Sequence, residues 1–252
     1  MPLRIGFDLD GVLADMDSEL LRQSEALFGE PMTRRLEEQP AEAGGAGSAA
    51  PDATDPAAGT PEAAPEFATP VIQLNMTSRQ QRRLWHHVET VENFWEGLEE
   101  IEPGIIQRLA TLAIDRRWEI IFLTKRPETA GATAQVQSQR WLASKGFTLP
   151  SVFVVQGSRG RIAASLALDI VVDDRPENCL DVVVDSKARA ILVWREDESR
   201  LPAAAQRLGI GVVKSVSDCL DILIQIDSTP RDQPGVMSRV MRLLGLKEPA
   251  SP

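Results

Sequence analysis

Two aspartates near the N-terminus, separated by one residue, are the side chains best placed to do chemistry. Asp8 and Asp10 follow the apolar run at 3–7, and Gly11 comes directly after them. Because side chains alternate along a strand, the pair is expected on one side, at the carboxyl end where open α/β sheets bind ligands. Two close carboxylates repel each other unless they share a cation or a proton. The spacing therefore predicts a Mg²⁺ site in which one carboxylate attacks and the other handles a proton.

A calcium loop is the alternative interpretation of this segment, because Asp-x-Asp-Gly also opens that motif. Such a loop needs further acidic ligands and a bidentate Glu at its twelfth position. Counted from Asp8, that position is Glu19, but no run of ligands follows Gly11 and an apolar strand precedes the pair. The surrounding sequence therefore favours the magnesium interpretation.

Three later segments place polar side chains at the end of an apolar run or at the start of a helix. They read EIIFLTKRP (residues 119–127), SRGRIAASLALD (158–169) and IVVDDRPEN (170–178). Together with FDLDGVLAD at 7–15, they resemble, in order, the four motifs of the haloacid-dehalogenase-like (HAD) phosphohydrolases. The resemblance extends over residues 3–15 and about 77–225, and it is specific at the four motifs.

The resemblance implies an α/β fold, a Rossmann-like parallel sheet with a small helical cap inserted after the first strand. It also implies phosphate-ester hydrolysis through an aspartyl-phosphate, with Asp8 as nucleophile and Asp10 as the group that moves the proton. The implied Mg²⁺ ligands are Asp8, the backbone carbonyl of Asp10, and Asp173, with Asp174 supporting the metal or its waters. The implied phosphate contacts are Thr124, Lys125 and Arg159.

The third motif departs from the family pattern. The family usually places a lysine there, and this chain has none between Lys145 and Lys187. Arg159 best matches the expected distance from the fourth motif, and Arg161 is the fallback. Arginine can bind phosphate through two hydrogen bonds but differs from lysine in shape and reach. A solvated arginine at a helix start is the alternative for Arg159.

Within the superfamily, the chain is most similar to the 5'(3')-deoxyribonucleotidase branch. The similarity lies in the first motif, in Phe94-Trp95 shortly before a Pro-Gly, in Trp141 and in the ending DDRPEN. It implies a nucleoside monophosphate as substrate, with Trp85, Phe94 and Trp95 stacking on the base. Packing of these rings between cap and core is the alternative. The second motif, LTKRP, departs from the Thr-Ser-Pro form of that branch.

Two other functions remain open from the sequence. One is hydrolysis of a small non-nucleotide phosphate ester by the same chemistry, and the other is a catalytically weak binding module. The net charge of −10 argues against a nucleic-acid polymer as partner, and no apolar run is long enough to cross a membrane. Only two cysteines and no visible signal peptide indicate a cytoplasmic protein. A homodimer is left open.

Strand-like runs alternate with helical patterns, which predicts a parallel sheet. The predicted domains are an α/β core at 1–14 and 101–227, a helical cap at 15–100 and a C-terminal tail at 228–252. Within the cap, residues 37–70 are dominated by Ala, Pro, Gly, Glu and Thr, which predicts a disordered linker. Thr77 and Thr90 are both expected to be helix N-caps.

Overall fold

The computed structural model of the protein describes residues 2–32 and 76–228. The predicted linker at 37–70 and the tail after residue 228 lie outside these ranges. In the described part, the strands form one sheet whose paired strands are all parallel. They are β1 (Arg4–Asp8), β2 (Glu119–Thr124), β3 (Ser151–Val154), β4 (Ile170–Asp173), β5 (Arg189–Val193) and β6 (Gly211–Val213). The predicted α/β parallel architecture is confirmed.

The strand order is β3-β2-β1-β4-β5-β6, which makes β1 a central strand. Phe7 of β1 pairs with Phe122 of β2 on one side and with Val172 of β4 on the other. The chain winds outward from β1 through β2 to β3, then crosses back to β4 and continues in the opposite direction. In open parallel sheets, the crevice at such a reversal, beyond the carboxyl ends of the strands, is where ligands bind. Here it lies where β1 and β4 end.

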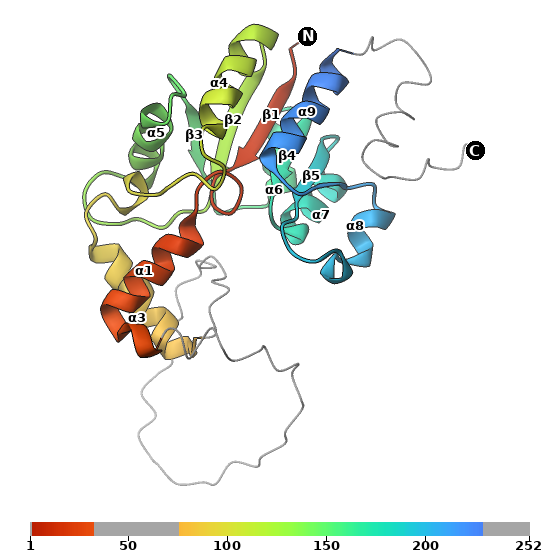
Figure 1. Ribbon diagram of the computed structural model, residues 1–252. Coiled ribbons are helices and arrows are strands. Elements are labelled where there is room, and N and C mark those ends of the chain that lie inside the picture. Colours follow the sequence, from red (N-terminus) through yellow and green to blue (C-terminus); the bar gives the residue numbers. More distant parts are fainter. Residues whose placement is uncertain (1, 33–75, 229–252) are drawn as a thin grey trace.

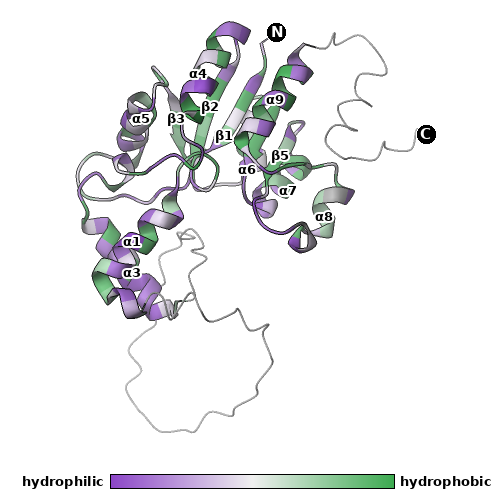
Figure 2. Cartoon of the chain, viewed as in Figure 1, coloured by the Kyte–Doolittle hydropathy of each residue, from purple (hydrophilic) through white to green (hydrophobic). Residues whose placement is uncertain are grey.

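Helices cover both faces of the sheet because the strands are apolar on both sides (Figures 1 and 2). In β2, Ile120 and Phe122 join the core beneath α4, α5 and α9, whereas Ile121 and Leu123 join the core beneath α6 and α7. The helices are α1 (Met16–Phe28), α3 (Ser78–Thr90), α4 (Ile105–Arg116), α5 (Ala134–Ser144), α6 (Arg159–Ser165), α7 (Pro176–Asp185), α8 (Ala203–Arg207) and α9 (Val216–Asp227), with 3₁₀ turns η1 (Phe94–Glu96) and η2 (Glu198–Arg200). No helix among these described residues is long and apolar enough to cross a membrane.

Helices α1 and α3 pack on each other to one side of the sheet (Figure 1). Thr77 caps α3 as expected, because its hydroxyl and the side chain of Gln80 form a reciprocal capping box. The second expected N-cap is wrong: Thr90 is the last residue of α3, and its hydroxyl donates to the His87 carbonyl at 2.7 Å. The next turn starts at Asn93, which adopts a left-handed conformation and accepts a hydrogen bond from the Ala132 amide instead. The division into core and cap stays a prediction.

Candidate active site

Three charged side chains meet where β1 and β4 end. Asp8 closes β1, Asp173 closes β4, and Arg159 opens α6. Arg159 donates from Nη2 to Asp8 Oδ1, and its Nε lies 3.6 Å from Asp173 Oδ2. All three residues are at most 7% exposed. The structure therefore places a buried guanidinium between the carboxylates of two adjacent strand ends.

The local sequence explains why Arg159 reaches this position. Ser158 caps α6 by accepting a hydrogen bond from the Arg161 amide at 3.1 Å, so the helix starts beside the strand ends. The side chain of Arg161, the fallback for the third motif, is 84% exposed and lies 4.0 Å from Asp185. The solvated alternative thus describes Arg161, whereas Arg159 is buried among the aspartates.

Asp173 and Asp174 differ in how they are held. Asp173 accepts hydrogen bonds from Asn178 Nδ2 at 3.0 and 3.1 Å and from the Arg175 amide at 2.9 Å. By contrast, Asp174 Oδ1 is buried and has no hydrogen-bond partner among the described residues. Burial raises the pKa of Asp8 well above its usual range, although Arg159 opposes this, and burial also raises the pKa of Asp173. Burial and the nearby Asp173 raise the pKa of Asp174 to about 7.

The carboxylate oxygens of these aspartates are ligands that suit a hard divalent cation. Asp174 Oδ1 has no hydrogen-bond partner in the described part of the chain, and burial raises the pKa of Asp8 and Asp173, so an added cation would stabilise the ionised carboxylates. Among the described residues, no group of three or more acidic, histidine or cysteine side chains is placed to hold a metal ion. Mg²⁺ does not require such a group, because it keeps several waters and uses one or two carboxylates with substrate phosphates. The residues therefore fit an open Mg²⁺ site.

A further cation, which the sequence analysis missed, follows the end of β2. Arg126, two residues after Thr124, donates from Nε and Nη2 to both oxygens of Asp10, at 2.7 to 3.0 Å. Thr124 adds its hydroxyl to Asp10 Oδ2 at 3.1 Å. Lys125 makes no hydrogen bond or ion pair to Asp8 or Asp10 in the described part of the chain. The only signal for Arg126 was its spacing, since side chains two apart share a side in extended chain.

The loop after Asp10 is held by another arginine that sequence reasoning did not find. Arg195 follows β5, donates to the Gly11 carbonyl at 2.6 Å, and pairs with Glu102 at 2.9 Å. Glu102 in turn accepts hydrogen bonds from the amides of Val216 and Ser217 in the first turn of α9. This chain of contacts ties the loop that carries Asp10 to the start of a core helix.

The three aromatic residues expected to contact the substrate are buried. Trp85, Phe94 and Trp95 are 6%, 3% and 0% exposed. Phe94 and Trp95 pack edge to face with ring centroids 4.8 Å apart, and the indole of Trp95 donates to the Pro127 carbonyl at 3.0 Å. This burial agrees with the packing alternative.

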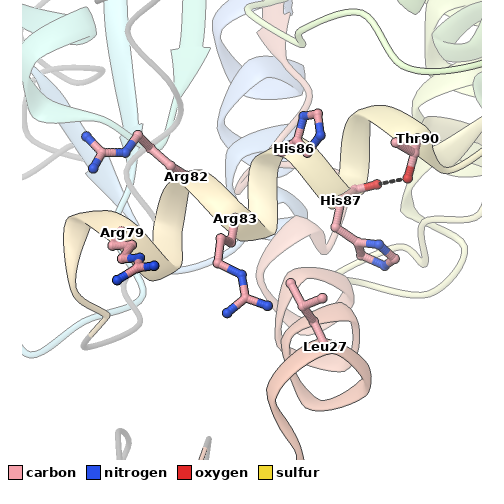
Figure 3. A pocket seen from close by; sticks show the side chains of 7 residues that line it. All are labelled: Leu27, Arg79, Arg82, Arg83, His86, His87 and Thr90. Atoms are coloured by element: carbon pink, nitrogen blue, oxygen red, sulfur yellow. Dashed lines mark hydrogen bonds between the residues drawn. The ribbon is translucent and has the colours of Figure 1, made fainter. Parts of the chain in front are cut away.

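A hollow on α3 is lined mainly by basic side chains (Figure 3). Arg83 and His87 extend toward Leu27 of α1, whereas Arg82 and His86 extend from the other side of α3. The lining contains none of the aspartates at the strand ends, so this hollow is separate from the carboxylate cluster.

Gly11 is required by its surroundings, and we expect Gly11→Ala to lower the free energy of unfolding by about 2–4 kcal/mol. Its φ of +80° is left-handed, and an added Cβ would lie 2.1 Å from Asp174 Oδ2. Gly104→Ala is the matched control, because Gly104 has the same φ of +80° with no atom within 4 Å of an added Cβ. Urea denaturation of both variants measures the difference. Equal losses would show that the contact with Asp174 has no energetic consequence.

The raised pKa of Asp174 predicts a pH-dependent stability. Because its pKa is about 7 in the folded chain against 3.8 when unperturbed, the folded state binds more protons between these pH values. In chelator, the free energy of unfolding should therefore fall as pH rises from about 4 to about 7. Asp174→Asn should be more stable than the parent by about 1–3 kcal/mol at pH 7.5, and equal to it at pH 3.5.

Denaturant titrations at the two pH values, in chelator, measure this difference. Asp221→Asn is the control, because this aspartate is exposed and pairs with Arg108 on the surface. A loss of stability for Asp174→Asn at pH 7.5 would contradict the prediction.

One of the comparisons with known proteins supports the fold. No protein-family model and no curated protein matches the sequence. Among solved structures, a candidate β-phosphoglucomutase from Thermotoga maritima superposes with a TM-score of 0.50 at 15% identity, covering 89% of this chain and 99% of the other. A hydrolase from Pseudomonas syringae gives a TM-score of 0.47 at 15% identity over 90% and 99% of the two chains. A HAD family hydrolase from Deinococcus radiodurans, solved with phosphate and sodium, gives 0.48 at 14% identity over 90% and 96%.

Proposed function

We propose that this protein is a Mg²⁺-dependent phosphomonoesterase of the HAD type that forms an aspartyl-phosphate on Asp8. The observation that carries the proposal is the buried cluster of Asp8, Arg159 and Asp173 at the point where the strand order reverses. Phosphoryl transfer needs an in-line nucleophile and positive charge around the phosphoryl oxygens. A buried carboxylate beside a guanidinium supplies both requirements in one place.

Each residue has a proposed role in the reaction. Arg159 holds Asp8 Oδ1, and no described residue hydrogen-bonds Oδ2, which is the proposed attacking oxygen. Asp10 gives a proton to the leaving oxygen as its bond to phosphorus breaks, and later takes one from the attacking water. Mg²⁺, held by Asp8, the Asp10 carbonyl and Asp173 with Asp174 in support, would neutralise phosphoryl charge. Thr124 and Lys125 are the proposed further phosphate contacts.

The substrate is proposed to be a small phosphate monoester. The similarity of the motifs to the deoxyribonucleotidase branch makes a nucleoside monophosphate the first candidate. A non-nucleotide ester, such as a sugar phosphate, is the second candidate, and the burial of Trp85, Phe94 and Trp95 favours it. Stacking can be worth about 1–3 kcal/mol per base, so its absence should be visible in substrate preference.

Phosphate release from a panel of nucleotides, sugar phosphates and p-nitrophenyl phosphate tests this proposal. We expect turnover that requires Mg²⁺ and stops in chelator. Turnover of nucleotides over sugar phosphates would support the first candidate, and the reverse preference would support the second. Equal turnover of a nucleotide and of the same sugar phosphate without the base would also favour the second candidate. Absence of turnover on every ester would contradict the proposed activity and favour a binding module.

A further inference from the structure

Arg126 has a buried guanidinium that is hydrogen-bonded on every side. Its side chain is fully buried, and that of Asp10, its partner, is 11% exposed. The remaining nitrogen, Nη1, donates to Ser138 Oγ at 2.9 Å, and Ser138 donates in turn to the Ala134 carbonyl within α5. Every nitrogen of the guanidinium therefore has an oxygen partner.

Two tryptophans flank the same guanidinium. The Arg126 carbon lies 4.9 Å from the ring centroid of Trp95 and 5.5 Å from that of Trp141. Each ring is anchored by its own indole N–H, Trp95 to the Pro127 carbonyl and Trp141 to the Leu98 carbonyl. Contacts between a buried cation and aromatic faces are favourable, and anchored rings restrict the cation to one position.

These contacts fix the orientation of the Asp10 carboxylate. A guanidinium bound to both carboxylate oxygens fixes the plane and direction of the carboxylate, which a single contact from a lysine would leave free to rotate. Thr124 adds a third donor from the end of β2. Proton transfer is sensitive to such placement, because the donor must lie within hydrogen-bond reach of the oxygen that it protonates.

We propose that Arg126 is a positioning residue that fixes the Asp10 carboxylate for proton transfer to the leaving oxygen. The inference rests on the proposed function. In the first step, an Asp8 oxygen bonds to phosphorus, the ester P–O bond breaks, and the Asp10 proton goes to the departing oxygen to give an alcohol. In the second step, water attacks the phosphoryl group, its proton passes to Asp10, and phosphate and the Asp8 carboxylate are regenerated. Arg126 acts only through Asp10.

Substrates that differ in leaving group separate positioning from a general structural role. An alkyl phosphate needs a proton on its departing oxygen, whereas p-nitrophenolate leaves readily without one. Arg126→Lys keeps the charge but loses the paired hydrogen bonds of the guanidinium to Asp10. For this variant we expect kcat/KM to fall about 100-fold for an alkyl phosphate. For p-nitrophenyl phosphate, we expect a fall of less than about 10-fold, because that reaction needs little acid assistance.

Four further variants complete the test: Asp10→Asn alone, its combination with Arg126→Lys, a serine variant and a control. Adding Asp10→Asn to Arg126→Lys should cost little beyond Asp10→Asn alone, because both changes affect one proton transfer. Ser138→Ala removes the Nη1 contact and the Ser138 bond to the Ala134 carbonyl, but leaves the hydrogen bonds from Arg126 to Asp10 in place. It should lower kcat/KM by a few-fold, more for the alkyl phosphate than for p-nitrophenyl phosphate, and it tests the inference even if Arg126→Lys fails to fold. Arg116→Lys is the control, because Arg116, at the end of α4, also joins an aspartate, Asp227, to a serine, Ser228. This control should leave kcat/KM unchanged for both substrates.

The outcomes separate this inference from the proposed function. Equal losses for both substrates, or additive effects of Arg126→Lys and Asp10→Asn, would overturn the positioning role while leaving the phosphatase intact. Absence of Asp8-dependent turnover in the parent protein would overturn the proposed function and this inference with it. A larger loss for the alkyl phosphate, absent in Arg116→Lys, would support the positioning role.

Discussion

Replacing Asp8 with asparagine is expected to lower phosphatase turnover by at least about 1,000-fold. Asparagine keeps the shape of the side chain and removes the carboxylate that would form the bond to phosphorus. The loss should appear in kcat for every substrate, because no other step of the proposed reaction can replace the nucleophile. A steady-state assay with the best ester of the panel measures it, and acid quenching of the parent protein during turnover should trap the phosphorylated aspartate.

Asp169→Asn is the matched control for this variant. Asp169 precedes β4 at the opposite edge of the sheet, where its Oδ2 accepts a hydrogen bond from the Arg4 amide at 2.8 Å. It should retain activity, so a loss shared by both variants would point to damage of the fold. Retention of more than about a tenth of the activity by Asp8→Asn would place the nucleophile elsewhere, since removing a nucleophile usually costs far more.

Replacing Arg159 is expected to have the largest effect on stability. Arg159→Met leaves Asp8 and Asp173 buried without their cation, and breaking a buried ion pair from one side typically costs about 3–5 kcal/mol. Because burial already raises the pKa of both aspartates, the loss should shrink below about pH 4, where they can be neutral. Denaturant unfolding at pH 7.5 and pH 4 measures the loss of stability and its dependence on pH. Activity at pH 7.5 should also fall by at least about 100-fold, since Arg159 would stabilise transferred charge.

Arg161→Met is the control, because Arg161 lies on the same helix with an exposed side chain. Its stability should stay within about 0.5 kcal/mol of the parent, as for other surface substitutions. Arg159→Lys keeps one charge but not the reach to two carboxylates, so it should recover only part of the stability. Equal stability of Arg159→Met and Arg161→Met would contradict the buried role of Arg159.

The sequence alone was enough to predict most of the fold. Apolar runs such as 120–123 and 170–172 identify central strands of a parallel sheet, because both faces of such strands are covered. The expected first strand and the cap at Thr77 agree with β1 and with the start of α3 as observed. Local patterns determine these elements, since a strand or helix needs only its own periodicity and capping residues. The same patterns located the aspartates, because they mark where strands end.

The tertiary structure alone decided how those residues are paired. Arg126 and Asp10 are 116 positions apart in the chain, and Arg195 lies 184 positions from Gly11. The sequence likewise left Arg159 and Arg161 as alternatives, and only packing of α6 against the strand ends buried the first. The aromatic residues show the same limit, because composition cannot tell a ring that faces a ligand from one that faces the core. Ion pairs and burial depend on which distant segments meet, and that is set by the packing of the whole sheet with its helices.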